Sequence, residues 1–231
     1  MRSHFVGSKG GSGIPQWLIT MMPAHRVFLE MFLGRGTIMD EKRPAEFSIG
    51  IDADAAAIDD YRRRHAQTNP AAAIVHGDCL KLVPGLKVES DWLVYADPPY
   101  LLSTRSHKRA YYDHEMFSEE EHDRLLTLLL SLPSMIMISG YWSELYAERL
   151  KGWRVAYFDT VNRAGKPARE FVWMNFEPPA VLHDTRHVGT DFTDRQRVKR
   201  KAERWRKKFQ HLPAAERQLI LNTLLSMPPA A

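Results

Sequence analysis

The chain has 231 residues, of which 44% are hydrophobic and 26% charged, so it is long enough to bury one substantial core. Its 13 glycines and 14 prolines are ordinary numbers, which excludes collagen-like and broadly disordered chains. A single cysteine excludes a disulfide scaffold and a multi-cysteine zinc or iron–sulfur site. No apolar run of about 18 residues is present to span a bilayer, and the N-terminus lacks the pattern of a signal peptide, so we expect a cytoplasmic protein.

The formal charge of +4 is distributed unevenly. Residues 1–192 hold 22 Lys and Arg against 25 Asp and Glu, a net charge of −3, whereas residues 193–231 hold 10 against 3, a net charge of +7. We therefore expect a main domain over residues 1–185 and a basic extension over residues 186–231. The positive charge of the extension is either a contact for a polyanion or a solvated helix face.

Short apolar runs alternate with helical patterns along most of the chain. The expected strands are residues 27–29, 47–51, 73–75, 92–96, 135–138, 155–158 and 171–176. Helices are expected over residues 55–65 and 118–132, the second opening on a capping box of Ser118 and Glu121. This alternation predicts an α/β fold with a doubly wound, mostly parallel sheet. Only a loop separates the last two strands, so they are expected to form an antiparallel hairpin at one end of the sheet.

The basic extension has the pattern of two helices. Within residues 193–210 and just beyond, apolar residues recur at spacings of four and three, at Val198, Ala202, Trp205, Phe209 and Leu212. A second helix is entered at Pro213 and carries further leucines. The sequence therefore predicts a C-terminal basic helical hairpin.

The sequence Asp97-Pro98-Pro99-Tyr100 directly follows the expected strand at 92–96. Two successive prolines remove two backbone donors and fix φ, which makes the turn rigid and leaves its carbonyl oxygens as acceptors. A carboxylate beside a carbonyl accepts both hydrogens of one amino group, and an aromatic ring stacks on a planar base. These four residues are therefore candidate catalytic residues for the exocyclic amine of a flipped nucleobase, with a structural Asp-Pro turn as the alternative.

The ends of three earlier strands carry candidate ligand-binding residues. They are Glu30, Phe32, Gly34 and Gly36 after the first strand, Asp52 after the second, and Asp78 and Cys79 after the third. Glycines after a strand let a ligand approach the backbone, and an acid about twenty residues later suits a ribose diol. Because ligands of open α/β sheets bind at the carboxyl ends of strands, we expect these residues to share one site.

Near the N-terminus stands Gly7-Ser8-Lys9-Gly10-Gly11, ahead of the glycine motif and of Asp97–Tyr100. In this order the motifs resemble those of the S-adenosylmethionine-dependent DNA adenine N6-methyltransferases of the Dam-like class, over roughly residues 5–177. The resemblance implies a Rossmann-like class I methyltransferase fold, S-adenosylmethionine as the cofactor, and double-stranded DNA with a flipped adenine as the substrate. It also implies a bacterial or phage-infected cell as the setting.

The resemblance assigns roles to individual residues. It puts Gly7, Lys9, Glu30, Phe32, Gly34, Gly36, Asp52, Asp78, Cys79 and Asp97 in the cofactor site, and Asp97, Pro98, Pro99 and Tyr100 at the target adenine. Within the cofactor site, Asp52 would bind the ribose hydroxyls and Asp78 the cofactor adenine.

Two departures from the family pattern stand out. Met31 occupies the place of a usual proline, a change that we expect to be tolerated. Only 16 residues, 80–95, separate Cys79 from Ala96, where the larger Dam-like enzymes carry a target-recognition domain. We therefore expect a short or relaxed sequence specificity, and the sequence does not distinguish restriction–modification, phage protection and regulation.

Two basic segments are candidate DNA contacts. One follows the catalytic turn and combines cations with aromatic rings, at Arg105, Lys108, Arg109, Tyr111 and Tyr112. The other is the positive face of the tail, at Lys199, Arg200, Arg204 and Lys207. The alternatives are an ordinary surface loop for the first segment, and for the second a helix docked on its own domain or on a second copy, so the chain is a monomer or a homodimer.

Other readings of the site stay open at this level. The second hypothesis is methylation of another planar amine, such as cytosine N4, an RNA adenine or a glutamine amide. Asp97 argues against it, because the enzymes that methylate those groups more often have serine or asparagine at this position. A non-catalytic DNA-binding module is the other alternative. We expect no metal site: His122 with its neighbouring glutamates has the pattern of an exposed first helical turn, and Cys79 that of a packing residue whose pKa Asp78 raises.

Overall fold

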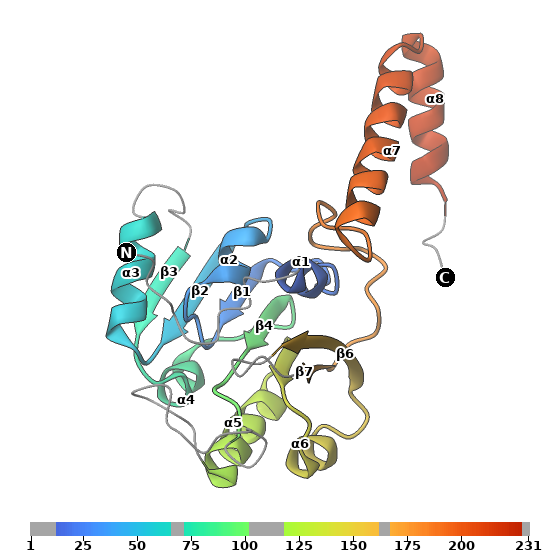
Figure 1. Cartoon of the computed structure of the whole chain (residues 1–231). Coiled ribbons are helices and arrows are strands. Elements are labelled where there is room, and N and C mark those ends of the chain that lie inside the picture. Colours follow the sequence, from blue (N-terminus) through green and yellow to red (C-terminus); the bar gives the residue numbers. More distant parts are fainter. Residues whose placement is uncertain (1–12, 66–71, 102–117, 162–166, 228–231) are drawn as a thin grey trace.

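The computed structural model describes residues 13–65, 72–101, 118–161 and 167–227. Its strands form one seven-stranded sheet in the order β3-β2-β1-β4-β5-β7-β6 (Figure 1). The strands are β1 (Val27–Glu30), β2 (Phe47–Asp52), β3 (Ala72–His76), β4 (Trp92–Ala96), β5 (Met135–Gly140), β6 (Arg154–Val161) and β7 (Pro167–Met174). Neighbours from β3 to β5 are parallel, whereas β7 is antiparallel to both β5 and β6. The predicted class I methyltransferase fold, a doubly wound sheet with an antiparallel terminal hairpin, is confirmed.

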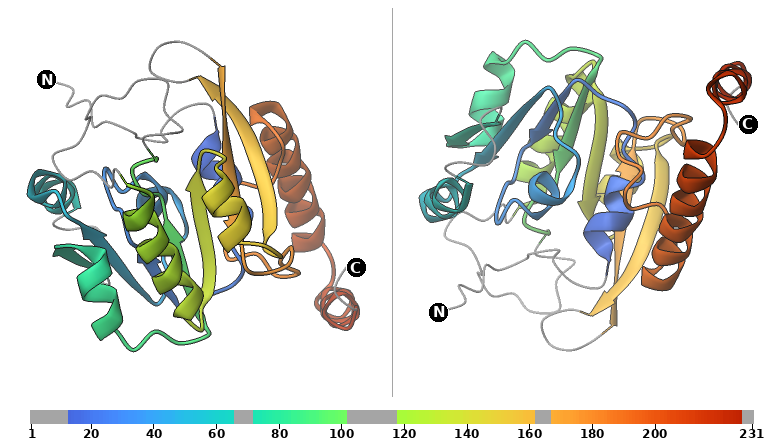
Figure 2. Two further views of the ribbon diagram at one scale, coloured as in Figure 1. Left: turned by 90° about the horizontal axis from the view of Figure 1, so that it is seen from below. Right: turned by 90° about the horizontal axis from the view of Figure 1, so that it is seen from above.

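Helices cover both faces of the sheet (Figure 2). One face packs on α1 (Ile14–Ile19), α2 (Thr37–Glu41) and α3 (Ala55–His65), and the other on α4 (Cys79–Leu82), the 3-10 turn η1 (Val83–Gly85), α5 (Glu119–Ser131) and α6 (Glu144–Arg149). Successive strand residues alternate between the two cores: Phe28 and Leu93 lie in one, and Leu29 and Val94 in the other. Parallel strands covered on both faces in this way need apolar residues on both sides, which is the pattern seen in the sequence.

The short helices α1, α2 and α6 were not expected from the sequence, because five or six residues are too few to show an apolar period. The capping box of Ser118 and Glu121 is confirmed at the start of α5. The last strand was expected over residues 171–176 but spans Pro167–Met174. Pairing with β6 extends it toward the polar residues 167–170, which the apolar pattern could not indicate.

The strand order reverses between the neighbouring strands β1 and β4: from β1 the chain continues to β2 and β3 on one side, and from β4 to β5 and the hairpin on the other. Such a switch point is where open α/β sheets bind ligands. The segment after β1 is tied to both neighbouring strands, because the Met31 amide donates to the Tyr95 carbonyl oxygen at 3.0 Å and the Leu33 amide to that of Ile51 at 2.8 Å. The segments leaving β1 and β4 therefore start side by side.

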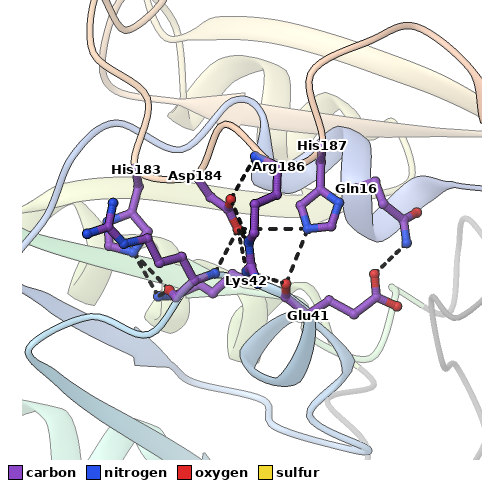
Figure 3. Close-up of polar contacts among 8 residues, drawn as sticks. Gln16, Glu41, Lys42, His183, Asp184, Arg186 and His187 are labelled. Carbon is purple, nitrogen blue, oxygen red and sulfur yellow. Dashed lines mark hydrogen bonds and ion pairs between the residues drawn. The ribbon is translucent and has the colours of Figure 1, made fainter. Parts of the chain in front are cut away.

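Residues 181–187 connect the sheet to the C-terminal helices and are fastened to the domain by a polar latch, which we define as Lys42, Arg43, His183, Asp184 and Arg186 (Figure 3). Asp184 is buried and accepts hydrogen bonds from the Arg43 amide at 2.7 Å and from Arg186 Nη2 at 2.7 Å. Lys42, 2% exposed, donates from Nζ to the Arg43 carbonyl oxygen at 2.9 Å. Burial of Asp184 alone would raise its pKa, but the hydrogen bonds from Arg186 and Arg43 outweigh it and hold the pKa well below its usual range. The latch fixes the point at which the C-terminal helices leave the domain.

The C-terminal helices are α7 (Phe192–Gln210) and α8 (Ala214–Leu225), and they extend away from the sheet (Figure 1). Figure 2 shows α8 end-on and α7 lengthwise, so the two helices cross obliquely instead of lying along each other. None of their residues is buried, and Trp205 in the expected apolar seam is 63% exposed. The two predicted helices are thus present, but neither packs its apolar face on the domain.

Candidate active site at the carboxyl ends of the strands

The loop after β1 depends on two glycines. Gly34 and Gly36 have φ values of 49° and 70°, a region that side chains rarely adopt. A Cβ atom on Gly36 would lie 2.3 Å from Cε2 of Tyr61, whereas one on Gly34 would meet nothing within 4 Å. The loop is therefore packed at Gly36 and open at Gly34, and the open side leaves room for a ligand against the backbone.

Asp52 at the end of β2 organises this loop. Its Oδ2 accepts a hydrogen bond from the Gly34 amide at 2.6 Å, and its Oδ1 one from the Asp54 amide at 2.8 Å. The structure thus brings the glycine motif and the acid of the second strand together, as the sequence predicts. Phe32, which precedes Gly34 in the chain, packs partly buried against the core on the α4–α6 face.

Glu30, the last residue of β1, is 3% exposed, and its Oε2 has no hydrogen-bond partner among the residues that the structure describes. Burial raises the pKa of this carboxyl well above its usual range, and the negative charges of Asp40 and Asp97 raise it further. A buried carboxyl oxygen without a partner is costly, and a cationic ligand would favour the ionised carboxylate and supply the missing donor. Together with the open backbone at Gly34, this residue set fits a ligand that carries an ammonium group.

Asp78 and Cys79 follow β3. The Asp78 side chain caps α4 by accepting a hydrogen bond from the Leu80 amide at 2.9 Å, so the structure gives it a local role that does not depend on a ligand. Cys79 is buried, and this burial, with a smaller effect of Asp78, raises the pKa of its thiol to about 12. The thiol is thus not a nucleophile at neutral pH, and Cys79 packs in the core as expected.

The turn after β4 carries Asp97, Pro98, Pro99 and Tyr100 and is held from two other strands. Asp97 Oδ1 accepts a hydrogen bond from the Ser139 hydroxyl of β5 at 2.8 Å. The Tyr100 hydroxyl donates to Glu170 Oε2 of β7 at 2.6 Å and approaches Asp97 Oδ1 at 3.4 Å. Burial, with the charges of Asp97 and Glu170, raises the pKa of Tyr100 well above its usual range, so the hydroxyl stays a donor.

Three residues that contact this turn were not predicted from the sequence: Ser139, Tyr141 and Glu170. The Tyr141 ring lies 4.5 Å from that of Tyr100, centroid to centroid, and extends an aromatic surface beside the Asp97–Tyr100 turn. Ser139 and Tyr141 follow the apolar core of a parallel strand, the same signal that pointed to Asp97. Glu170 had no such signal, because it comes from an antiparallel strand whose polar end faces the site.

Several predicted residues lie outside this constellation or outside the described residues. Those outside the described residues are Gly7, Lys9, Arg105, Lys108, Arg109, Tyr111 and Tyr112. Exposed positions on α7, distant from the sheet, hold Lys199, Arg200, Arg204 and Lys207 (Figure 1). Between β3 and β4 the chain forms only α4, η1 and a short loop, so the expected lack of an inserted recognition domain there is confirmed.

The prediction that His122 lies in an exposed turn is wrong. His122 is 1% exposed, because the helix turns it into the core, where its Nδ1 lies 2.8 Å from the Tyr146 hydroxyl. Within the described ranges, no group of three or more His, Cys, Asp or Glu side chains is arranged to hold a metal ion. None of the described helices combines the length and apolar character needed to cross a membrane.

Residues 82–159 match the family of D12 class N6 adenine-specific DNA methyltransferases. The matched segment contains the Asp97–Tyr100 turn and Ser139, and it confirms the resemblance to the Dam-like class there. No curated protein matches the sequence.

Solved structures with a similar fold share little sequence with this chain. An rRNA methylase from Streptococcus thermophilus is 10% identical, with a TM-score of 0.48 over 71% of this chain and 94% of its own. A Streptococcus mutans protein solved in complex with SAH is 11% identical, with a TM-score of 0.47 over 69% and 94%. A dimethyladenosine transferase from Plasmodium falciparum is 15% identical, with a TM-score of 0.45 over 69% and 59%. Because these scores are below 0.5, the fold assignment rests on the strand order of this chain.

Proposed function

We propose that this chain, a methyltransferase by its fold and by its match to the D12 class over residues 82–159, methylates the exocyclic N6 amine of adenine in DNA. The observation that carries the proposal is the Asp97–Tyr100 turn, which sits at the switch point of the sheet and is fixed there by Ser139 and Glu170. The acid at the first position of the turn favours adenine N6 over the other planar amines.

The cofactor is S-adenosylmethionine, which supplies an activated methyl group on a positive sulfonium. Gly34 and Gly36 would bring the backbone close to it, Glu30 would accept from its ammonium group, and Asp52 would take the ribose hydroxyls. The open backbone at Gly34 and the Oε2 of Glu30, which has no hydrogen-bond partner in the described part of the chain, support this assignment. Asp78 would need to accept from the cofactor adenine while still capping α4.

In the proposed reaction the protein mainly has to align and polarise the adenine amine. The lone pair of an adenine amine is delocalised into the ring, so the amine is a weak nucleophile. When the Asp97 carboxylate and the Pro98 carbonyl each accept one N–H, the nitrogen becomes more tetrahedral and its lone pair turns toward the methyl group. Alignment and electrostatics of this kind supply most of the rate enhancement, and Asp97 takes up the proton only as the new bond forms.

Double-stranded DNA is the proposed partner, with the target adenine flipped into the site. The acidic body at −3 does not attract a polyanion, so the positive charge must come from the loop after the catalytic turn and from α7. Because the segment between β3 and β4 is short, we propose a short or relaxed sequence specificity. This substrate would place the reaction in the cytoplasm of a bacterial or phage-infected cell.

The decisive test compares the unmodified chain with Asp97→Ala, using labelled cofactor and duplex DNA, single-stranded DNA or RNA. Asp97→Ala is expected to retain cofactor binding and to lose methyl transfer, because it removes one acceptor of the amine. Asp91→Ala is a matched control, since this exposed acid precedes the other end of the same strand and pairs with Arg26 at 2.6 Å. Normal turnover of Asp97→Ala refutes the assignment, and label in RNA or in cytosine alone supports the alternative substrates.

A further inference from the structure

The carboxylate of Asp97 is held by a chain of two buried hydroxyl groups. Ser139, which is fully buried, donates from Oγ to Asp97 Oδ1 at 2.8 Å, and the Tyr95 hydroxyl lies 3.1 Å from Ser139 Oγ. A serine hydroxyl has only one hydrogen, which Ser139 gives to Asp97. Tyr95 must therefore donate to Ser139, and the hydrogen bonds run in one direction from Tyr95 through Ser139 to Asp97.

The strand register produces this arrangement. Tyr95 stands opposite Met137 and Ala96 opposite Ile138, so Ser139 comes next to the point where Asp97 leaves β4. On the other side, Ser139 pairs with Val172 of β7. Tyr95 is 1% exposed, and burial, with the charge of Asp97, raises its pKa well above its usual range, so the phenol keeps its proton at any physiological pH.

We propose that Ser139, supported by Tyr95, is a positioning residue that fixes the rotation of the Asp97 carboxylate for the incoming amino group. The inference rests on the proposed function, since it gives Asp97 its place at the reacting amine. The terminal torsion of an aspartate is broad, so a carboxylate without such a partner samples many orientations. A hydrogen bond to a charged oxygen is stronger than a neutral one, and two in series strengthen each other.

The first test is Ser139→Ala in the full chain. We expect kcat to fall about 10- to 100-fold, because misplacing a reacting group by roughly 1 Å costs that much, while the KM for DNA and the affinity for cofactor stay within about threefold. Ser134→Ala is the matched control: this serine lies just before the same strand, is 4% exposed, and its Oγ has no partner among the described residues. It should leave kcat unchanged.

The second test separates positioning from folding. Ser139→Ala leaves the buried Tyr95 hydroxyl without its acceptor, which costs stability, whereas the double variant with Tyr95→Phe removes both groups. Tyr95→Phe alone should lower kcat less than Ser139→Ala, and it should add no further loss in the Ser139→Ala background. A merely structural role predicts that the double variant, which leaves no buried hydroxyl unpaired, recovers kcat together with stability, whereas two residues that act independently predict additive losses in the double-mutant cycle.

A third test needs no substrate and measures the state of the Asp97 carboxyl group directly. In a chain labelled with carbon-13 at aspartate, the Asp97 carboxyl resonance should move in Ser139→Ala and stay in place in Ser134→Ala. Absence of adenine methylation by the unmodified chain refutes the proposed function, while the resonance still reports on the hydroxyl chain. An unmoved resonance, an unchanged kcat in Ser139→Ala, or additive losses would each overturn the positioning role.

Discussion

Four cations on the outer surface of α7 should control how steeply DNA binding weakens with salt. Among the residues that the structure describes, Lys199, Arg200, Arg204 and Lys207 have no ion-pair partner, whereas Arg206 and Arg197 of the same helix bind acids at 2.7 Å. An unpaired cation on an exposed helix is available to a phosphate without first breaking another contact. The perturbation is therefore the replacement of those four residues by glutamine.

The magnitude follows from counterion release. Each phosphate contact contributes about 0.9 to the slope of log K against log salt, so four lost contacts lower the slope by about 3.6. Raising the salt fourfold, from about 50 to 200 mM, then weakens the unmodified chain about 150-fold more than the variant. At the lower salt the variant binds more weakly than the unmodified chain, because the same contacts supply affinity.

The assay is fluorescence anisotropy of a labelled duplex across this salt range, with the unmodified chain, the quadruple variant and a control. The control is the double replacement Arg197→Gln and Arg206→Gln, which removes cations already balanced by Asp194 and Glu203. For each charge removed, this control should change the slope of log K against log salt less than the quadruple variant does. An unchanged slope in the quadruple variant removes α7 from the DNA interface, and equal slopes per charge in both variants refute the distinction between paired and unpaired cations.

Three further predictions concern the domain itself. Gly36→Ala should cost at least about 1–2 kcal/mol from its positive φ alone, more from the contact with Tyr61, and should weaken cofactor binding in a titration. Glu170→Gln should lower methyl transfer about tenfold, because it weakens the hydrogen bond that holds Tyr100. Burial, with the charge of Lys42, lowers the pKa of His25 to about 3, so the unfolded chain binds this proton at a higher pH than the folded chain does. The free energy of unfolding should therefore fall by about 1.5 kcal/mol between pH 6.5 and 5, as measured by thermal unfolding.

Each of these three predictions has a control variant and a result that would contradict it. Gly152→Ala has a similar backbone with φ 89° but nothing within 4 Å of the new Cβ, so equal losses in both glycine variants would deny the packing argument. Glu177→Gln changes an exposed acid beyond the same strand, and a comparable loss of turnover there would remove the specific role of Glu170. His25→Phe should flatten the pH dependence, and an unchanged profile would assign it to other groups.

The sheet could be predicted from the sequence because its strands are apolar on both faces and end at turn residues. That is why β4 and α3 lie where they were expected, at Trp92–Ala96 and Ala55–His65. The acids at the ends of β2 and β4 were found by the same reasoning, since strand ends at one edge of a parallel sheet converge. The hydrogen bond from the Gly34 amide to Asp52 is the direct expression of that convergence.

What the sequence could not indicate depends on pairing between distant segments. The polar end of β7 is a strand only because β6 pairs with it, and this pairing brings Glu170 to Tyr100. The latch at Asp184 joins residues about 140 positions apart in the chain, so no local sequence pattern predicts it. His122 was misplaced for a related reason: the charges before it mark an exposed turn, but the rotation of α5 carries the next residue into the core.

The two prolines of the Asp97–Tyr100 turn and the chain of hydroxyl groups from Tyr95 and Ser139 together determine how this turn is anchored. Pro98 and Pro99 have no N–H, so the turn cannot anchor itself through its own backbone donors, although its carbonyls stay available as acceptors. The anchoring donors come instead from side chains, with the Ser139 hydroxyl on Asp97 and the Tyr100 hydroxyl on Glu170. In the proposed site the turn thus offers its acceptors to the adenine amine, while a donor on β5, Ser139, and an acceptor on β7, Glu170, hold the turn from behind.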